Sequence, residues 1–212
     1  MASAFGFATD KVIAKPECNI GYAKCLKKAS CPVTGYKDLD VNAWYHDGVH
    51  FCLENGYMDG TSKGVFEPNK KITRAQLITI LWRIAGSPVS NCYLGYNDVS
   101  NNSEEWYVDA LRWATGEKII SGDNGYFYPK NPITREQFAV ILYRFSKEKA
   151  VTMTLNFTDS ELIHEYAKEA VSWCYEKGII TGDENKALNP QGSATRTQAA
   201  VMIQRLCEYG KL

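Results

Sequence analysis

Small and apolar residues recur along this chain at helical spacing in three separate stretches. In each stretch they occupy positions i, i+4, i+7 and i+8, which lie on one face of an α-helix. The three sets are Trp44, Gly48, Phe51 and Cys52; Trp106, Ala110, Trp113 and Ala114; and Tyr166, Ala170, Trp173 and Cys174. Each stretch predicts a helix that continues for a few apolar positions and stops at a glycine, a common helix terminator. These glycines are Gly60, Gly122 and Gly182.

A second helix is predicted after each first one. It begins at a threonine that is followed three residues later by glutamine, the spacing of a capping box. The pairs are Thr73 and Gln76, Thr134 and Gln137, and Thr195 and Gln198. The loop before each threonine carries an apolar residue two positions ahead of a proline. Because the residue before a proline is pushed out of the helical region, this loop should be extended or turned.

These elements make three copies of one unit. The Thr-Arg pairs begin at 73, 134 and 195, and prolines stand at 68, 129 and 190, so both series advance in steps of 61 residues. One helix pair of this length cannot bury its apolar face alone, and three pairs must therefore pack on one another. The predicted organisation is an N-terminal tail or linker at 1–35 and repeats at 36–90, 96–150 and 157–210. Together the repeats form one folded domain at 36–210.

Composition and charge exclude several classes of protein. Hydrophobic residues make up 45% of the chain and charged residues 23%, as in ordinary soluble globular proteins. The 24 basic residues balance 24 acidic ones, so no global field attracts nucleic acid or an anionic membrane. No apolar run reaches the ~18 residues of a membrane helix. The first ten residues also lack the features of a signal peptide, so an exported form would need a signal that this chain does not show.

The cysteines and histidines do not predict a metal site. Seven cysteines are an odd number, and the spacings of Cys18, Cys25 and Cys31 differ from the C-x-x-C spacing of structural zinc sites. His46 and His50 have the i, i+4 spacing of two metal ligands on a helix. The corresponding residues in the other repeats are Val108 and Arg112, then Lys168 and Ser172. Such variability is typical of a solvated face, so neither a metal ion nor a cofactor is expected.

No catalytic residue is predicted either. Cys52 and Cys174 stand where the second repeat has Ala114, which indicates a small buried position and an inert thiol. The chain has no G-x-S-x-G motif, P-loop or dinucleotide fingerprint. A thiol or zinc hydrolase that uses Cys174 or His46 would need further catalytic groups to converge in one pocket.

An arginine follows the capping threonine of each second helix. The three are Arg74, Arg135 and Arg196. At this position the helix dipole is positive, so each arginine would cost about 0.3–1 kcal/mol unless an anion lies nearby. The anion could be internal, because Asp38, Asp98 and Asp159 also recur. It could equally be an external carboxylate or phosphate, bound by the guanidinium and the free N–H groups of the helix end.

An aromatic residue at the start of each first helix adds a third recurring feature. The three are Trp44, Trp106 and Tyr166. A ring in this position serves by default as a core anchor, or alternatively as a partly exposed platform for the apolar face of a sugar. Both roles can hold at once, because an indole has two faces. An aspartate, an aromatic ring and an arginine in each unit would suit an anionic saccharide.

The blocks YKDLDVNAWYHDGV and VFEPNKKITRAQ, with their two later copies, resemble the S-layer homology family. The resemblance covers residues 36 to 208 and three tandem units. It implies an all-α fold in which three helix-loop-helix repeats form a pseudo-threefold, three-pronged spindle with a central helical bundle. The sequence departs from the family pattern by glutamine in place of glutamate after T-R-A, by Tyr166 in place of tryptophan and by Leu188 in place of the loop phenylalanine.

The resemblance also implies a function and a set of ligand residues. The expected function is noncatalytic anchoring at the cell surface, in the cell wall or S-layer, through a secondary cell-wall polysaccharide with an anionic, pyruvylated terminal sugar. The implied residues are Asp38, Trp44, Gly60 and Arg74 in unit one, Asp98, Trp106, Gly122 and Arg135 in unit two, and Asp159, Tyr166, Gly182 and Arg196 in unit three. The alternative is a protein-interaction or self-assembly scaffold that contacts other S-layer subunits and binds no glycan. Exposure of the arginines would discriminate between the two.

Overall fold

The described part of the chain is helical. The computed structural model describes residues 25, 30–102, 104–149, 151 and 153–210. Its α-helices are α1 (His46–Glu54), α2 (Arg74–Ile84), α3 (Val108–Gly116), α4 (Arg135–Ser146), α5 (Glu165–Glu176) and α6 (Arg196–Tyr209). Two short 3-10 helices, η1 (Pro32–Gly35) and η2 (Ser160–Leu162), complete the elements, and no β-strand forms within the described ranges. The predicted all-α class is confirmed.

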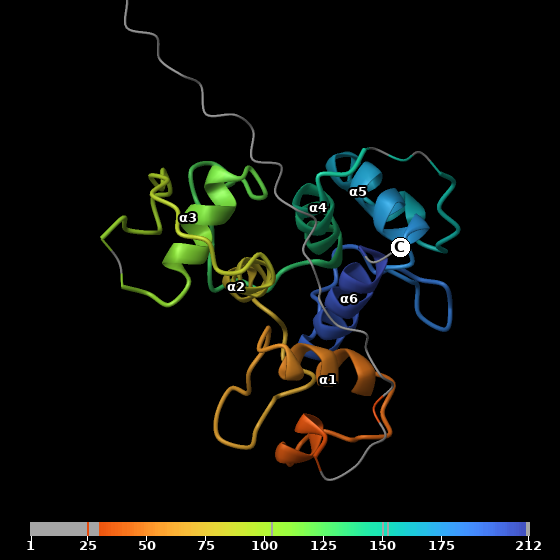
Figure 1. The fold of residues 1–212 in the computed structure, drawn as a ribbon. Helices are drawn as coiled ribbons and strands as arrows, with labels where there is room; N and C mark the ends of the chain where they lie inside the picture. Colours follow the sequence, from red (N-terminus) through yellow and green to blue (C-terminus); the bar gives the residue numbers. More distant parts are fainter. Residues whose placement is uncertain (1–24, 26–29, 103, 150, 152, 211–212) are drawn as a thin grey trace, which may run out of the picture.

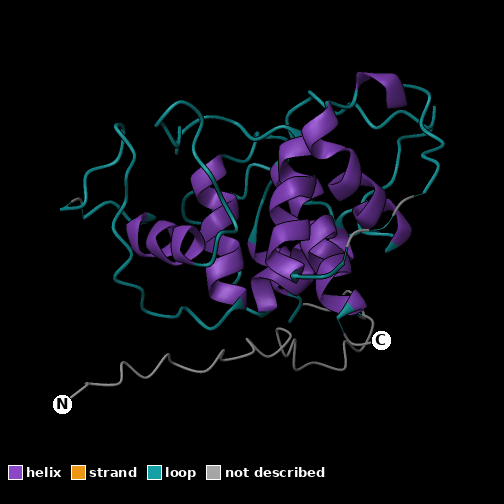
Figure 2. Ribbon diagram, turned by 90° about the horizontal axis from the view of Figure 1, so that it is seen from above, coloured by secondary structure: helices purple, strands orange, loops and turns teal. Residues whose placement is uncertain are grey.

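The second helices α2, α4 and α6 lie together near the middle of the molecule, and the first helices lie outside them in three lobes (Figure 1). Seen from above, the helices cross at several angles and the loops run around them (Figure 2). Each first helix packs against the second helix of the preceding repeat, so that α3 packs on α2 and α5 on α4. Helix α1 packs on α6, which joins the two ends of the repeat array.

A closed cycle of backbone hydrogen bonds links the three repeats just before their second helices. The amide of Ile72 donates to the carbonyl of Ala194, that of Ala194 to Ile133, and that of Ile133 back to Ile72, with N···O distances of 3.0, 3.1 and 3.0 Å. Each repeat therefore supplies one donor and one acceptor. Because no repeat can satisfy these groups alone, the cycle makes the three units depend on one another.

The second helices begin as the sequence predicts. Both hydrogen bonds of the capping box are present at each of the three threonines. The next backbone N–H groups donate to loop carbonyls of the neighbouring repeat: in α2, those of Arg74 and Ala75 reach Asn131 and Pro129, both at 3.0 Å. The same bonds recur at α4 and α6. The prediction that these helix ends offer free N–H groups to an external anion is therefore wrong, because neighbouring repeats occupy them.

The first helices end sooner than predicted. Helix α1 stops at Glu54, several residues before Gly60, because Gly56 adopts a left-handed conformation (φ 66°) that turns the chain. Gly60 serves another purpose: a Cβ atom there would lie 2.6 Å from the ring of Tyr36. Gly122 likewise packs against the ring of Tyr96. These two glycines permit close packing of a loop and do not terminate a helix.

Two cysteines of the first helices lie in the core, as predicted. Cys52 and Cys174 are fully buried, and burial raises the pKa of both thiols. A thiol that stays protonated is a poor nucleophile, which agrees with the inert role expected from the sequence.

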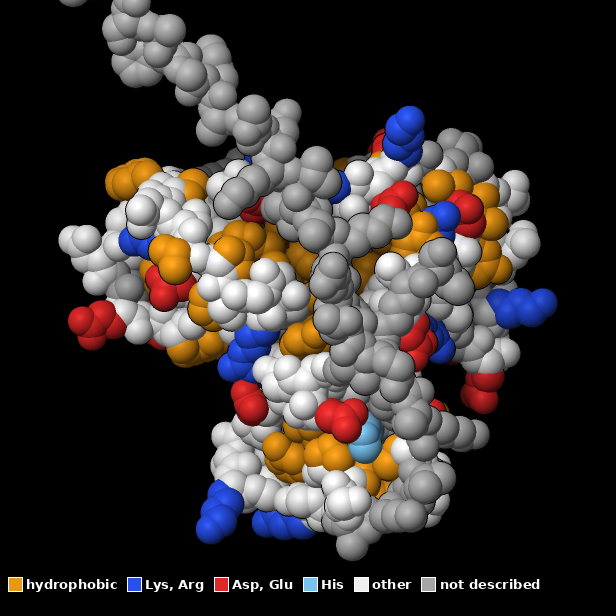
Figure 3. All heavy atoms as spheres, viewed as in Figure 1, with side chains coloured by type: hydrophobic (Ala, Val, Ile, Leu, Met, Phe, Trp, Pro, Cys, Tyr) orange, Lys and Arg blue, Asp and Glu red, His pale blue; other side chains and the backbone are white. Residues whose placement is uncertain are grey.

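Charged side chains are scattered over the face shown in the space-filling view and form no single large patch (Figure 3). This distribution fits the balanced composition. Among the described residues, no helix is both long and apolar enough to cross a membrane.

Gly48→Ala is expected to destabilise the protein at the contact between α1 and α6. A Cβ atom at Gly48 would lie 2.7 Å from the Cα and 2.8 Å from the backbone nitrogen of Val201. Helix propensity alone would favour alanine by about 1 kcal/mol. Backbone atoms cannot move aside as a side chain can, so we expect a net loss of about 1–3 kcal/mol in the free energy of unfolding.

Urea denaturation measures this change, and Gly116→Ala serves as the control. Gly116 also lies in a first helix, but its nearest neighbours beyond the helix would be 3.4 Å from an added Cβ. We expect this variant to be neutral or more stable by up to about 1 kcal/mol. Equal stabilisation of both variants would contradict the close contact between α1 and α6.

Candidate functional site

Each recurring aspartate binds the loop of its own repeat. The carboxylate of Asp38 accepts hydrogen bonds from the backbone N–H groups of Phe66, at 2.9 Å, and Glu67, at 2.7 Å. Asp98 and Asp159 bind the corresponding loops at 2.7–2.8 Å. Burial raises the pKa of Asp38, but its hydrogen bonds with Phe66 and Glu67 outweigh this effect and lower it overall. The three aspartates thus hold loops in shape.

The aspartates stabilise an unfavourable backbone conformation. The residue before each loop proline has a positive φ: 59° at Glu67, 58° at Tyr128 and 53° at Asn189. Residues other than glycine seldom adopt this left-handed conformation. The carboxylate accepts the N–H group of that same residue in each repeat, which explains why all three repeats retain an acid there.

Each recurring arginine reaches into the next repeat. The Nε atom of Arg74 donates to the carbonyl of Phe127 at 2.8 Å, and its guanidinium lies 4.8 Å from the centre of that ring. Arg135 donates to Leu188 at 2.6 Å and Arg196 to Phe66 at 2.8 Å. These loop residues are buried. Each arginine thus joins two neighbouring repeats.

The predicted internal pairing of arginine with aspartate is wrong for the described residues, among which these three arginines form no ion pair. The two groups instead bind opposite ends of one loop residue. At Phe127, Asp98 accepts the N–H hydrogen bond and Arg74 donates to the carbonyl. The backbone N–H and C=O groups of Phe127 therefore lie between the carboxylate of Asp98 and the guanidinium of Arg74.

The recurring aromatic rings are exposed, which overturns their default assignment as core anchors. The exposed fractions of Trp44, Trp106 and Tyr166 are 67%, 58% and 57%. Helices α1 and α3 begin two residues after their tryptophans. The tyrosine that follows each tryptophan is turned further inward and packs edge-on against it: Tyr45 at 5.6 Å and Tyr107 at 5.3 Å between ring centres. The alternative, an exposed platform, agrees with this geometry.

One cavity gathers three of the predicted residues, and each comes from a different repeat. Arg74 of the first repeat, Gly122 of the second and Tyr166 of the third line a cavity of about 590 Å³, here called groove one. Its other polar lining residues include Ser121, Asp123, Gln137 and Arg144. The structure thus does not bring together the ligand residues of a single repeat. It combines equivalent positions from three repeats.

A second, smaller cavity follows the same rule. Groove two, of about 210 Å³, is lined by Arg196, Gly60 and Trp106. The remaining arginine, Arg135, belongs to a third set of equivalent residues. One of its terminal nitrogens donates to the carbonyl of Thr181 at 3.2 Å, directly before Gly182. By the symmetry of the repeats, the aromatic residue of this third position is Trp44.

The two grooves differ in how free their arginines are. Arg196 is only 5% exposed and donates from a second nitrogen to the carbonyl of Asp59 at 2.5 Å. Arg83 in the same groove pairs with the carboxylate of Asp59 at 2.8 Å. In groove one, Arg74 uses only Nε for hydrogen bonding within the described structure. Arg144 there bonds Ser121 at 3.3 Å. Groove one therefore offers the more accessible positive charge.

Arg74 remains protonated in this setting. Burial lowers its pKa, while Asp98 and the acidic Asp123 of groove one act in the opposite direction. An arginine starts so far above neutral pH that such burial does not discharge it. The guanidinium is available to pair with an anion at neutral pH.

Sequence reasoning missed the residue that holds Tyr166. Glu136, only 2% exposed, accepts a hydrogen bond from the Tyr166 hydroxyl at 2.9 Å and lies 2.7 Å from Nδ1 of His164. Burial and this bond raise the pKa of Tyr166. The only signal in the sequence was a glutamate where the other repeats have Ala75 and Thr197.

The histidines of α1 also differ from expectation. His46 and His50 are 3% and 7% exposed, so the prediction of a solvated face is wrong. They pack against Cys31 and Cys25 of the preceding segment, which the repeat comparison could not reveal because that segment occurs once. Cys18, the third cysteine of this cluster in the sequence, lies outside the described residues.

Comparisons with known proteins agree with the threefold repeat. The profile of the S-layer homology domain matches residues 35–78, 95–139 and 156–200. The three matched segments correspond to the three repeats identified in the sequence.

Relatives of known name are considerably longer than this chain. It is 30% identical over 179 residues to an amylopullulanase of Thermoanaerobacterium thermosulfurigenes, an alignment that covers 82% of this chain and 9% of the relative. Identity to an S-layer protein of Bacillus thuringiensis subsp. finitimus is 25%, over 92% of this chain and 24% of the relative. A cellulosome-anchoring protein of Acetivibrio thermocellus is 26% identical, over 74% of this chain and 36% of its own length.

Proposed function

This chain belongs to the S-layer homology domain family, and we propose that it is a noncatalytic module that anchors a protein at the bacterial cell surface. The names of an S-layer protein and a cellulosome-anchoring protein among its relatives support this role. The match to an amylopullulanase covers 9% of that enzyme, so it does not imply that this chain shares the enzyme's activity. We propose the cell wall or S-layer as its location.

We propose a secondary cell-wall polysaccharide with an anionic, pyruvylated terminal sugar as the ligand. The observation that carries this proposal is groove one, where the guanidinium of Arg74 faces the same cavity as Tyr166. A pyruvate ketal presents a carboxylate, which an arginine binds through strong, charge-assisted hydrogen bonds. The apolar face of the attached sugar would stack on the tyrosine ring.

The other predicted residues take different parts in the same proposal. Arg144 adds a second positive charge to groove one, and the backbone at Gly122 forms its wall. Groove two and the third position contain the equivalent arginines and aromatic rings, but those arginines make more bonds to the protein. We therefore expect groove one to bind the polysaccharide most tightly. Asp38, Asp98 and Asp159 act as positioning residues that shape the loops.

Cosedimentation with cell-wall sacculi tests this function. The sacculi should come from a bacterium whose wall polysaccharide carries pyruvate ketals, with a matched sample treated with mild acid to remove them. We expect the protein to pellet with the first sample and to remain in solution with the second. Equal pelleting with both, or none with either, would overturn binding through the anionic sugar.

Glu136→Ala is expected to weaken binding to untreated sacculi several-fold. Without this carboxylate, Tyr166 loses its 2.9 Å hydrogen bond and its ring is no longer fixed beside groove one. The matched control is Glu165→Ala, which removes an exposed neighbouring carboxylate that pairs with Lys168. Binding isotherms from sedimentation would measure both variants, and equal affinity of Glu136→Ala and wild type would contradict the positioning role.

Exposed aromatic residues support a second candidate function, a scaffold that assembles with other S-layer subunits. Trp44 is 67% exposed and Tyr93 is 77% exposed. Large exposed rings are common at protein interfaces. Sedimentation velocity over a range of concentrations tests this candidate: self-association lost on Trp44→Ala would favour the scaffold, and a monomer throughout would count against it.

A further inference from the structure

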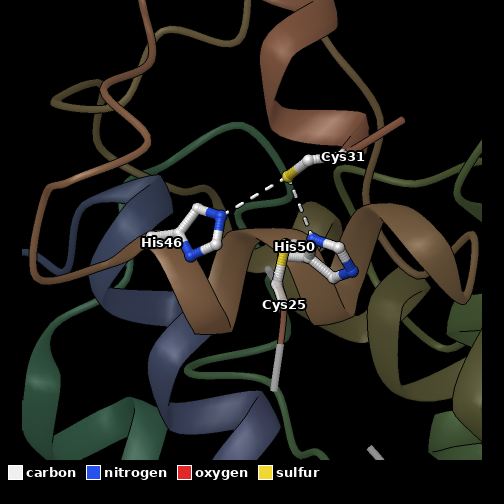
Figure 4. Close-up of side chains that lie close together, drawn as sticks. All are labelled: Cys25, Cys31, His46 and His50. Carbon is white, nitrogen blue, oxygen red and sulfur yellow. Dashed lines mark hydrogen bonds between the residues drawn. The ribbon is translucent and has the colours of Figure 1, made fainter. Parts of the chain in front are cut away.

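Four side chains with metal-binding atoms converge beside the first repeat. They are Cys25, Cys31, His46 and His50, and one ligand atom from each lies within 4.8 Å of all the others. The histidines come from α1 and the cysteines from the segment before it, as Figure 4 shows. Cys31, His46 and His50 are at least nine-tenths buried. The cluster is therefore a shielded group of two sulfur and two nitrogen donors.

The distances approach those of a tetrahedral metal site. The Cys31 sulfur lies 3.4 Å from Nε2 of His46 and 3.1 Å from Nδ1 of His50. Around a tetrahedral zinc ion with Zn–S of about 2.3 Å and Zn–N of about 2.0 Å, neighbouring ligand atoms are about 3.3–3.8 Å apart. Small side-chain rotations would bring these atoms to that spacing.

Each histidine is oriented by a carboxylate on its other ring nitrogen. Nδ1 of His46 lies 3.0 Å from Asp47, and Nε2 of His50 lies 3.3 Å from Glu54. A carboxylate accepts a hydrogen bond from the ring N–H that faces it, so the opposite nitrogen of a neutral ring presents a lone pair. Both lone pairs then point toward Cys31. Histidine ligands of metal ions commonly have such a carboxylate partner.

A cation at the centre would use all four donor atoms at once. Thiols are only weak hydrogen-bond donors and acceptors, whereas thiolate sulfur and the lone pair of a neutral imidazole are strong ligands of zinc.

We propose that Cys25, Cys31, His46 and His50 bind a single Zn²⁺ ion with tetrahedral geometry. Two thiolates and two imidazoles form a donor set that suits zinc and leaves no open position for catalysis. The ion has a structural role: it links Cys25 and Cys31 to α1. None of the four ligands lines groove one or groove two, so the zinc site is separate from the proposed glycan site.

The ion would stabilise only the first lobe. The positions equivalent to His46 and His50 hold Val108 and Arg112 in the second repeat and Lys168 and Ser172 in the third. The cysteines precede the repeat array and have no copies. Because the four ligands occur only once, the site would fix the chain just before the first repeat. The recurring arginines and aspartates, in contrast, make equivalent contacts in all three repeats.

Metal analysis of the reduced protein is the direct test. Wild-type protein, purified with a reductant in zinc-supplemented buffer and freed of excess metal, should contain one zinc ion per chain by mass spectrometry. Cys31→Ser should lose the ion, and Cys92→Ser, which alters a cysteine outside the cluster, should retain it. Wild-type protein without bound zinc would overturn the proposal, whatever the folding of the variants.

Substitution of Co²⁺ for Zn²⁺ identifies the ligand atoms by spectroscopy, so this test does not depend on whether a variant folds. Co²⁺ in the wild-type site should give the visible bands of tetrahedral coordination and a thiolate charge-transfer band in the ultraviolet. Cys25→Ser should halve the charge-transfer band. Octahedral spectra would contradict the geometry. A Cys25–Cys31 disulfide in mass spectra of protein prepared with both zinc and reductant would show that the cysteines pair with each other instead.

Discussion

Asp38→Ala is expected to lower the free energy of unfolding by about 2–4 kcal/mol. Its two hydrogen bonds to a charged group would contribute about 1.5–3 kcal/mol each if fully buried, and the partial exposure of Asp38 reduces this sum. The carboxylate accepts the N–H groups of Phe66 and Glu67. Glu67 is also held with a positive φ, so its loop has no easy alternative partner. Chemical denaturation of the variant measures the loss.

Two controls separate the loop contact from a general loss of charge. Asp40→Ala removes an exposed carboxylate that accepts one local N–H, from Asn42 at 2.8 Å, and should cost less than about 1 kcal/mol. Asp38→Asn keeps the shape but not the charge and should fall between the two. Equal effects of Asp38→Ala and Asp40→Ala would contradict the structural role of the loop contact.

The contribution of Asp38 should also depend on pH. Its pKa is lowered in the folded protein, so the stabilisation is present above the unfolded pKa of about 4 and is lost as pH falls through the folded value. The difference in stability between wild type and Asp38→Ala should therefore be constant near neutral pH and shrink in acid.

Arg74→Ala is expected to reduce affinity for pyruvylated wall polysaccharide by roughly 10- to 100-fold, the range of one charge-assisted hydrogen-bonding group at about 1.5–3 kcal/mol. The guanidinium is the cation of groove one that reaches between two repeats. Loss of its charge-assisted bond to the Phe127 carbonyl should also lower the free energy of unfolding, by about 1.5–3 kcal/mol. Isothermal titration calorimetry with purified polysaccharide would measure the affinity.

The controls for Arg74 distinguish charge from geometry. Lys168→Ala removes one positive charge outside groove one, from an exposed pair with Glu165, and should leave affinity within about twofold of wild type. Arg74→Lys keeps the charge but loses the planar fork, so it should bind with intermediate affinity. A folded Arg74→Ala variant with wild-type affinity would remove Arg74 from the site.

Local signals in the sequence were sufficient for the second helices. The capping box depends on two side chains three residues apart, so Thr73 and Gln76 predict their own hydrogen bonds wherever the helix packs. Each first helix ends where a residue just beyond it adopts the left-handed backbone conformation, with a positive φ. Gly56 could have indicated this, but Lys118 does the same in the second repeat with a φ of 59°, and no residue preference predicts that.

The composition of the grooves could not be predicted by comparing the repeats. Alignment identifies equivalent residues and groups them by repeat, whereas contacts between repeats decide which of them meet. Arg74 meets Gly122 and Tyr166 because each second helix reaches the loop of the next repeat. The same limit applies to His46 and His50, whose partners Cys25 and Cys31 lie outside the repeated units.

A double-mutant cycle on polysaccharide affinity tests most directly whether the binding site is assembled from three repeats. The variants are Arg74→Ala, Tyr166→Ala and Trp44→Ala, with the two doubles that contain Arg74→Ala. Residues that share a site show coupled effects, whereas distant ones add within about 0.5 kcal/mol. We predict coupling between Arg74 and Tyr166, which line groove one together, and additivity between Arg74 and Trp44. Coupling of Arg74 with Trp44 of its own repeat, and additivity with Tyr166, would contradict this site.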